Sequence, residues 1–221
     1  MELSSRMKHY EIQSVGSHLL YRCPAIIRLD GRSFHSFAKN LDKPFDLCLE
    51  WFMMQTAKYL CDDISTAKLA YGQSDEISIL LVDYDNLNTE QWFGGTVQKV
   101  VSSCAASATL AFNTSIHNIS TCTFYTSEKE EIWMPKLNKA TFDARTFSIP
   151  KEDVTNYFIW RQKDAQSNSI QAVGQYYFSH NRMMGKSNDQ VQEMLFQEYG
   201  INWNNLPTRH KRGWCIYRDI D

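Results

Sequence analysis

Apolar runs with strand-like and helix-like spacing follow one another along the first 150 residues of the chain. Residues 25–29 (AIIRL) form a short run with β-branched residues that ends at an Asp-Gly turn signal, which is typical of a buried strand. From residue 46 to residue 60 the apolar positions recur every three or four residues, and this spacing predicts a helix that Asp46 is able to cap. Further strands are expected at residues 68–71, 77–82 and 140–149, and a second, buried helix at residues 97–112.

The predicted order of elements is β-α-β-β-α-β, which matches a ferredoxin-like fold of the α+β class. In such a fold an antiparallel sheet carries two helices on one of its faces. We therefore expect one sheet-containing part over residues 1–150 and a mainly helical C-terminal part, residues 151–221, packed against it.

The C-terminal part is expected to contain three helices and a returning strand. The helices are predicted at residues 153–165, 168–178 and 187–199, the last capped by Ser187 or Asn188. Residues 202–212 are polar and predicted as a loop, and residues 214–217 as the strand. The pattern of residues 113–139 does not determine an element.

Composition narrows the class of protein. Hydrophobic residues make up 43% of the 221 residues and charged residues 22%, which is ordinary for a globular protein. No stretch approaches the roughly 18 apolar residues of a membrane span, and the N-terminus lacks the apolar run of a signal peptide, so we expect a cytoplasmic protein with no membrane partner. The six cysteines show no C-x-x-C spacing and are expected to be reduced, mostly buried thiols. A net charge of −2 argues against indiscriminate polyanion binding but leaves an RNA enzyme open, because binding depends on where Lys and Arg residues lie.

Three carboxylates lie at the ends of predicted strands, at positions that should meet at one edge of the sheet. Asp30 comes directly after the first strand, and Asp75 and Glu76 lie in the hairpin between the next two. Carboxylates crowded at one rim repel one another unless cations neutralise them. Mg²⁺ prefers such oxygen ligands, and two ions about 3.5–4 Å apart stabilise the attacking and leaving oxygens of a phosphoryl transfer. A simpler interpretation remains, in which Asp-Gly is only a turn and Asp75-Glu76 only a polar hairpin tip.

Motifs around these carboxylates extend over nearly the whole chain in a fixed order. They are RLDGRSFHSF (28–37), Lys43-Pro44, YGQSDEIS (71–78), WFGGTVQK (92–99), FDAR (142–145), WRQKDA (160–165) and INWNNLP (201–207). Together they resemble the tRNA-histidine guanylyltransferase superfamily, whose members add nucleotides in the 3′-to-5′ direction at the 5′ end of tRNA. The resemblance implies a polymerase-like palm over residues 1–150 and an RNA-contacting part over residues 151–221.

The resemblance also implies roles for individual residues. Asp30, Asp75 and Glu76 would be catalytic, with Asp30, Asp75 and the Gly31 carbonyl as ligands of two Mg²⁺ ions and Glu76 as a support for metal or substrate. Lysine suits a phosphate site because its ammonium group is a compact charge. The residues expected at the nucleotide are Gly31, Arg32, Ser33, Phe34, His35, Lys43, Ser74, Lys99 and Ser102.

The implied chemistry has two stages. ATP or GTP activates a 5′-monophosphate on the RNA, and the 3′-hydroxyl of an incoming nucleoside triphosphate then attacks the activated end. Members specific for histidine tRNA carry an H-I-N-N motif shortly after W-R-Q-x-D, whereas this chain has Gln166-Ser167-Asn168-Ser169. The departure favours the bacterial and archaeal-type members and template-dependent repair of truncated tRNA, over a specialist that adds G at position −1 of histidine tRNA.

Contacts to tRNA are expected mainly from the densest basic cluster of the chain, because Lys and Arg bound to phosphates supply most of the affinity for RNA. We predict RNA contacts for Arg209, Lys211, Arg212 and, in the QSNS stretch, Asn168. A solvated basic loop is the alternative for the cluster. The resemblance further implies a homotetramer, built as a dimer of dimers, with one tRNA reaching across subunits.

Two functions of other classes compete with tRNA repair. A palm-type nucleotide cyclase would carry G-G-[DE]-E-F in its hairpin, where this chain has YGQSDE. A metal-free RNA-binding module would display aromatic residues on its central strands, where this chain has aliphatic residues that end in carboxylates.

Overall fold

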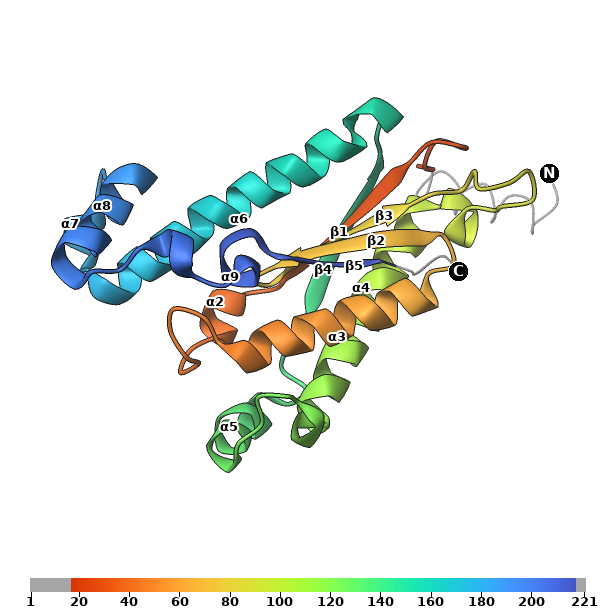
Figure 1. Ribbon diagram of the computed structural model, residues 1–221. Helices are drawn as coiled ribbons and strands as arrows, with labels where there is room; N and C mark the ends of the chain where they lie inside the picture. Colours follow the sequence, from red (N-terminus) through yellow and green to blue (C-terminus); the bar gives the residue numbers. More distant parts are fainter. Residues whose placement is uncertain (1–16, 218–221) are drawn as a thin grey trace.

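The computed structural model describes residues 17–217, which form a five-stranded antiparallel sheet with helices on both faces (Figure 1). The order across the sheet is β4-β1-β3-β2-β5. The strands are β1 (Ala25–Gly31), β2 (Ala67–Gln73), β3 (Glu76–Leu81), β4 (Phe142–Ser148) and β5 (Trp214–Tyr217). The helices are α2 (Phe34–Phe37), α3 (Leu47–Asp63), α4 (Val97–His117), α5 (Ser127–Trp133), α6 (Val154–Tyr177), α7 (His180–Met183), α8 (Asn188–Tyr199) and α9 (Thr208–Arg212). This architecture confirms the predicted α+β class.

One face of the sheet packs against α3 and α4 and forms the main hydrophobic core. The alternation of side chains along β1 directs every second residue to this face, and its buried members are Ala25, Ile27 and Leu29. Phe52 of α3 and Phe112 of α4 are fully buried there, with ring centroids 5.9 Å apart. The α3 helix begins as predicted, because the Asp46 carboxylate accepts a hydrogen bond from the Leu49 amide at 2.9 Å. None of the helices between residues 17 and 217 is both long and apolar enough to cross a membrane.

The opposite face of the sheet carries polar side chains and is crossed by α6 (Figure 1). Arg161 of α6 donates from Nε and Nη2 to the two carboxylate oxygens of Glu76 in β3, each at 2.6 Å, and both side chains are buried. The hydroxyl groups of Tyr157 in α6 and Ser78 in β3 lie 2.9 Å apart. These polar contacts fix where α6 lies on the sheet.

Beyond the edge of the sheet, the second half of α6 joins α7 and α8 in a helical arm (Figure 1). The arm has its own small core, which contains Ile170, Val173, Val191, Leu195 and Trp203. Ser187 caps α8 and forms a capping box with Gln190, so one of the two predicted caps is confirmed.

Two C-terminal segments differ from the prediction. The QSNS stretch predicts a break between two helices, but α6 runs through it as one helix of 24 residues. Ser169 is buried and accepts a hydrogen bond from Trp203 Nε1 at 3.0 Å. This tertiary contact engages a hydroxyl that could otherwise bond to backbone groups and weaken the helix. Residues 202–212 are not a plain loop, since they contain a 3₁₀ turn (Trp203–Asn205) and α9.

The predicted return of the chain into the sheet is confirmed. Trp214–Tyr217 pair with β2, and Trp214 lies opposite Gly72. Only glycine permits this approach, because a Cβ atom at position 72 would lie 2.2 Å from the Trp214 ring. The segment of undetermined pattern continues α4 to His117 and then forms α5.

We expect Arg161→Ala to lower the free energy of unfolding by about 3–5 kcal/mol, because the variant leaves the Glu76 carboxylate buried without its partner. Urea denaturation followed by circular dichroism measures the change. Arg182→Ala is the matched control: Arg182 and Glu198 also share two hydrogen bonds, but both side chains are exposed, so a much smaller loss is expected. Equal losses in the two variants would contradict the role assigned to the buried pair.

Candidate active site

The carboxylates expected to lie together meet at one edge of the sheet, where β1 ends and β2 turns into β3. Asp30 is the cross-strand partner of Glu76, and the Gly31 amide donates to the Asp75 carbonyl at 3.0 Å. Ser74 and Asp75 form the two-residue turn, and Ser74 adopts a left-handed φ of 50°. The Ser74 hydroxyl donates to the Asp75 carboxylate at 3.0 Å. The turn therefore places a hydroxyl and a carboxylate beside Asp30.

Asp30 lies between two arginines on the polar face of the sheet. Its Oδ2 accepts hydrogen bonds from Arg28 Nε at 3.3 Å and from Arg145 Nη2 at 3.1 Å. Arg145 also lies 3.7 Å from Asp143, the residue opposite Asp30 on β4. Sequence reasoning missed both arginines. The period of two along a strand was the available signal, because it places Arg28 on the same face as Asp30 and Arg145 on the same face as Asp143.

The two acids of the hairpin differ in their surroundings. Burial raises the pKa of Asp75 and the negative charge of Asp30 adds to the rise, while the hydrogen bond from Ser74 opposes it. Burial also raises the pKa of Glu76, against the hydrogen bonds from Arg161. The support of metal or substrate by Glu76 stays a prediction, and in this structure Arg161 donates a hydrogen bond to each of its two carboxylate oxygens. In this structure Glu76 anchors α6.

The donor set at this edge fits magnesium. Asp30 and Asp75 provide carboxylate oxygens, and the Gly31 carbonyl belongs to the same stretch of backbone. A Cβ atom at position 31 would lie 2.3 Å from the Phe34 ring, so only glycine allows this packing. Within residues 17–217 no three Asp, Glu, His or Cys side chains converge as a complete cage. Mg²⁺ usually takes one or two carboxylates and completes its shell with water and substrate phosphates, so these donors suit an ion that binds with a phosphorylated substrate.

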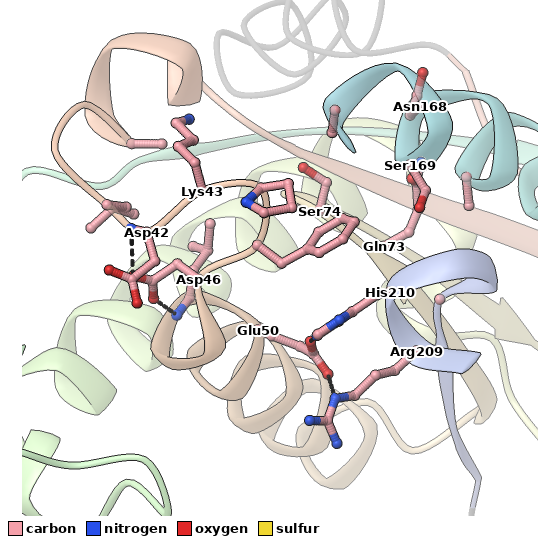
Figure 2. A pocket seen from close by; sticks show the side chains of 18 of the residues that line it. Asp42, Lys43, Asp46, Glu50, Gln73, Ser74, Asn168, Ser169, Arg209 and His210 are labelled. Atoms are coloured by element: carbon pink, nitrogen blue, oxygen red, sulfur yellow. Dashed lines mark hydrogen bonds and ion pairs between the residues drawn. The ribbon is translucent and has the colours of Figure 1, made fainter. Parts of the chain in front are cut away.

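A cavity of about 270 Å³ opens beside the Ser74-Asp75 turn (Figure 2). Lys43, Ser74 and Asn168 line it from the loop before α3, from the β2–β3 hairpin and from α6. Its apolar lining includes Leu41, Phe45, Ala165 and Ala172. The volume approaches that of small-molecule sites, and apolar walls with a few polar groups are their usual lining. The cavity therefore brings predicted nucleotide residues together with Asn168, which we expected at RNA.

The α9 side of the cavity is attached to α3 by ion pairs (Figure 2). Glu50 forms an ion pair with Arg209, in which Oε1 lies 2.9 Å from Nε, and its other carboxylate oxygen lies 3.0 Å from His210 Nε2. The His210 ring stacks on Phe45, with centroids 4.5 Å apart. Sequence reasoning missed Glu50 and His210, since no local pattern connects positions so far apart along the chain.

The basic cluster predicted to bind RNA is only partly open to a ligand. Arg209 is engaged by Glu50, and Lys211 Nζ donates to the Asn204 carbonyl. Arg212 is exposed at the end of α9. Of the three basic residues, Arg212 is therefore placed best for a phosphate.

The residues after Gly31 divide between surface and core. The Phe34 side chain is buried against the rings of Phe112 and Phe142, so only its backbone is left for the predicted nucleotide contact. The other three expected positions lie on the surface near the carboxylates: Arg32, Ser33 and His35.

Lys99 and Ser102 lie at the other end of the sheet from Asp30. They belong to the first two turns of α4, and the residues that open this helix bond to residues 17–19, just before β1. Strands rise about 3.4 Å per residue, so the two ends of β1 are roughly 20 Å apart. The structure therefore does not bring these two residues to the carboxylates within one chain.

Comparison with known proteins finds a matching family and several similar proteins. A family model described as "Thg1: tRNAHis guanylyltransferase" matches residues 4–150. The "Probable tRNA(His) guanylyltransferase" of Dictyostelium discoideum is 30% identical over 213 residues, which cover 90% of this chain and 77% of that protein.

Solved structures of bacterial tRNA(His) guanylyltransferase (Thg1)-like protein show the same fold. One, in complex with ATP, is 42% identical with a TM-score of 0.88 and covers 99% of this chain and 89% of its own. Another, in complex with GTP, is 40% identical with a TM-score of 0.79 and covers 98% and 84%.

We expect Asp75→Asn to stabilise the metal-free protein at neutral pH. Because burial raises the pKa of Asp75 in the folded state, its ionisation costs folding free energy, and the wild type loses stability as the pH rises from the unfolded-state pKa to the raised one. Denaturation in a chelator should show the gain at neutral pH and no gain well below about 3.9, the ordinary aspartate pKa. Added Mg²⁺ should favour the wild type instead. A less stable variant at neutral pH in chelator would contradict the burial argument.

Proposed function

This chain belongs to the tRNAHis guanylyltransferase (Thg1) family of nucleotidyltransferases, and we propose that it repairs truncated tRNA by template-dependent 3′-to-5′ nucleotide addition. The observation that carries the proposal is the meeting of Asp30 and Asp75 beside a cavity lined by Lys43 and Ser74. Carboxylates beside a cavity that contains a lysine and a serine suit the transfer of a nucleotide between phosphate oxygens.

The first stage would join the RNA 5′-phosphate to ATP or GTP. An oxygen of the RNA 5′-monophosphate attacks the α-phosphate of the nucleotide, and pyrophosphate leaves. Lys43 and Ser74 would bind the triphosphate from the cavity walls, and Asp30, Asp75 and the Gly31 carbonyl would hold two Mg²⁺ ions. When bound, Mg²⁺ neutralises charge that develops on the phosphate oxygens. The bacterial relatives in complex with ATP and with GTP support the choice of nucleotides.

The second stage would add the new nucleotide. The 3′-hydroxyl of an incoming nucleoside triphosphate attacks the activated 5′-phosphate, a phosphodiester bond forms, and the activating nucleotide leaves as its monophosphate. Most of the catalytic work left to the protein is the alignment of these groups. The Arg161–Glu76 pair serves that alignment, because it fixes α6 and with it Asn168 relative to the Ser74-Asp75 turn.

The stretch that would carry the H-I-N-N motif supports repair over histidine specificity. Asn168 Nδ2 donates to Asp164 at 3.2 Å, and Ser169 is bonded to Trp203. The stretch therefore presents no histidine to read a particular tRNA. Base pairing with the opposite RNA strand would choose the added nucleotide.

We further propose the division of labour and the assembly that the resemblance implies. Residues 1–150 would act as a palm-like catalytic domain, and the residues from 151 onward would help bind tRNA. A homotetramer, as a dimer of dimers, would give Lys99 and Ser102 a role, because a second subunit would bring them to a nucleotide that their own chain holds too far away.

The first test of the proposed function varies the base that lies opposite the missing nucleotide. Purified protein is given tRNAs that lack their first nucleotide and differ in the opposing base, together with Mg²⁺ and all four nucleoside triphosphates. We expect addition of the complementary nucleotide in each case, read by sequencing the 5′ end. If an unpaired G is added whatever the opposing base, the repair proposal is wrong.

Lys43 provides the second prediction. Lys43→Ala should raise the KM for the nucleoside triphosphate about tenfold or more, since a charge-assisted hydrogen bond contributes roughly 1.5–3 kcal/mol. Lys39→Ala is the control, because Lys39 is an exposed lysine in the same loop region that does not line the cavity. Similar kinetics for the two variants would remove Lys43 from the nucleotide site.

A further inference from the structure

An exposed tryptophan of α6 lies beside Arg161, the partner of Glu76, on the flank of the helix that faces β4. Trp160 is 53% exposed, although the next residue is Arg161, the buried anchor of the helix. The Arg161 guanidinium lies 4.4 Å from the centroid of the indole, and the Tyr157 ring packs edge-on at 5.8 Å. One face of the indole is therefore covered and held in place, while much of the ring remains open to solvent.

The surface around Trp160 leads toward Asp30. Tyr157 contacts Phe147 of β4 at 5.9 Å, and Phe147 is 38% exposed. Two residues before Phe147 on the same strand and the same face is Arg145, which bonds to Asp30. We call the surface formed by Trp160, Phe147 and Arg145, with the buried Tyr157 between the two aromatic rings, the aromatic strip.

The guanidinium behind the indole is held on both sides. Arg161 donates to Glu76 in β3 and, at 2.9 Å, to Asp164 in its own helix. The positive charge of Arg161 is therefore neutralised by two carboxylates. The indole packs against a guanidinium whose position is fixed by these bonds. Little conformational freedom remains to be lost when a flat ligand stacks on its open side.

The surroundings of Trp160 suit a nucleobase better than a protein partner. Lys163 and Asp164 follow Trp160 by three and four residues and so lie on the same side of α6, and Arg145 lies on β4. A stable protein interface needs several hundred Å² of contiguous surface with an apolar centre, which two partly exposed rings, Trp160 and Phe147, beside charged side chains do not supply. Exposed aromatic rings near cationic groups are the usual platform for single-stranded nucleic acid, because every base has a π-face.

We propose that Trp160 stacks on a base of the RNA end that reaches the active site, and that the aromatic strip holds this end for nucleotide addition. The inference rests on the proposed function, because it takes RNA as the substrate, and it identifies the surface that positions it. Stacking accepts any base. Repair of many tRNAs requires such tolerance, since pairing with the opposite strand selects the nucleotide while Trp160 only positions the end.

Three variants test the inference on the full chain. Trp160→Leu keeps an apolar side chain but removes the π-face, and Trp160→Phe keeps a smaller π-face. Ile159→Ala is the matched control, since Ile159 is 45% exposed one residue away and faces the β2 and β5 side of α6. The probe is a labelled tRNA that lacks its first nucleotide, titrated by fluorescence anisotropy without nucleoside triphosphates.

We expect Trp160→Leu to raise the Kd for this tRNA about tenfold, the loss expected for one stacked base, while Trp160→Phe recovers most of the affinity and Ile159→Ala matches the wild type. The slope of log Kd against log salt should not change, because no phosphate contact is lost. Quenching of intrinsic fluorescence on tRNA binding should also shrink in Trp160→Phe, which tests the contact in a variant that keeps an aromatic ring.

Unchanged tRNA affinity in Trp160→Leu would overturn the inference. So would a raised KM for the nucleoside triphosphate with RNA affinity intact, which would assign the ring to the incoming nucleotide, or a change in oligomeric mass, which would assign it to a subunit interface. The proposed function fails separately: Asp75→Ala should lose nucleotide transfer and retain tRNA binding, and full transfer activity in that variant would end the functional proposal whatever Trp160 does.

Discussion

Two hydrogen bonds of 2.6 Å join Arg161 of α6 to Glu76 of β3 on the polar face of the sheet. Burial of two charges costs several kcal/mol unless the pair is well aligned and its remaining groups are bonded, and here both carboxylate oxygens have a partner. Glu76 also follows Asp75 in the hairpin and lies opposite Asp30. The contact that anchors α6 is thus part of the carboxylate edge, so the helix, the cavity wall that contains Asn168 and the exposed Trp160 all take their positions from it.

The two faces of the sheet differ in role: one stabilises the fold, and the other carries the charged side chains of the candidate site. The face against α3 and α4 is apolar and closely packed, and its burial supplies the driving force for folding. The other face concentrates carboxylates and arginines. There Asp75 is half-buried, and partial burial together with the negative charge of Asp30 raises its pKa, while Arg28 and Arg145 neutralise Asp30. A site of this kind is less stable by itself than an apolar surface would be, and the core on the opposite face compensates for it.

Long-range contacts complete the site. Lys43 lies in the loop before α3, Ser74 in the hairpin and Asn168 in α6, and they line one cavity because the sheet, α6 and α9 enclose it. Glu50 holds α9 against α3 through Arg209 and His210. Asn168 and Arg209, which we expected to bind RNA, therefore help to line this cavity, and Arg212 and Trp160 are exposed on the surface.

The sequence by itself determined the order of strands and helices in the palm-like part, the cap at Asp46, the return of residues 214–217 as a strand, and the family. Periodicity reports which face of each element is buried, and ordered motifs report ancestry, so both are readable along the chain. Tertiary structure alone decided that Glu76 pairs with Arg161, that Phe34 packs in the core, that Lys99 lies at the far end of the sheet and that α6 continues through residues 166–169. These outcomes depend on which distant side chains meet. A partner such as Trp203 for Ser169 satisfies a polar group that local propensity would assign to a break, and no local pattern specifies such a partner.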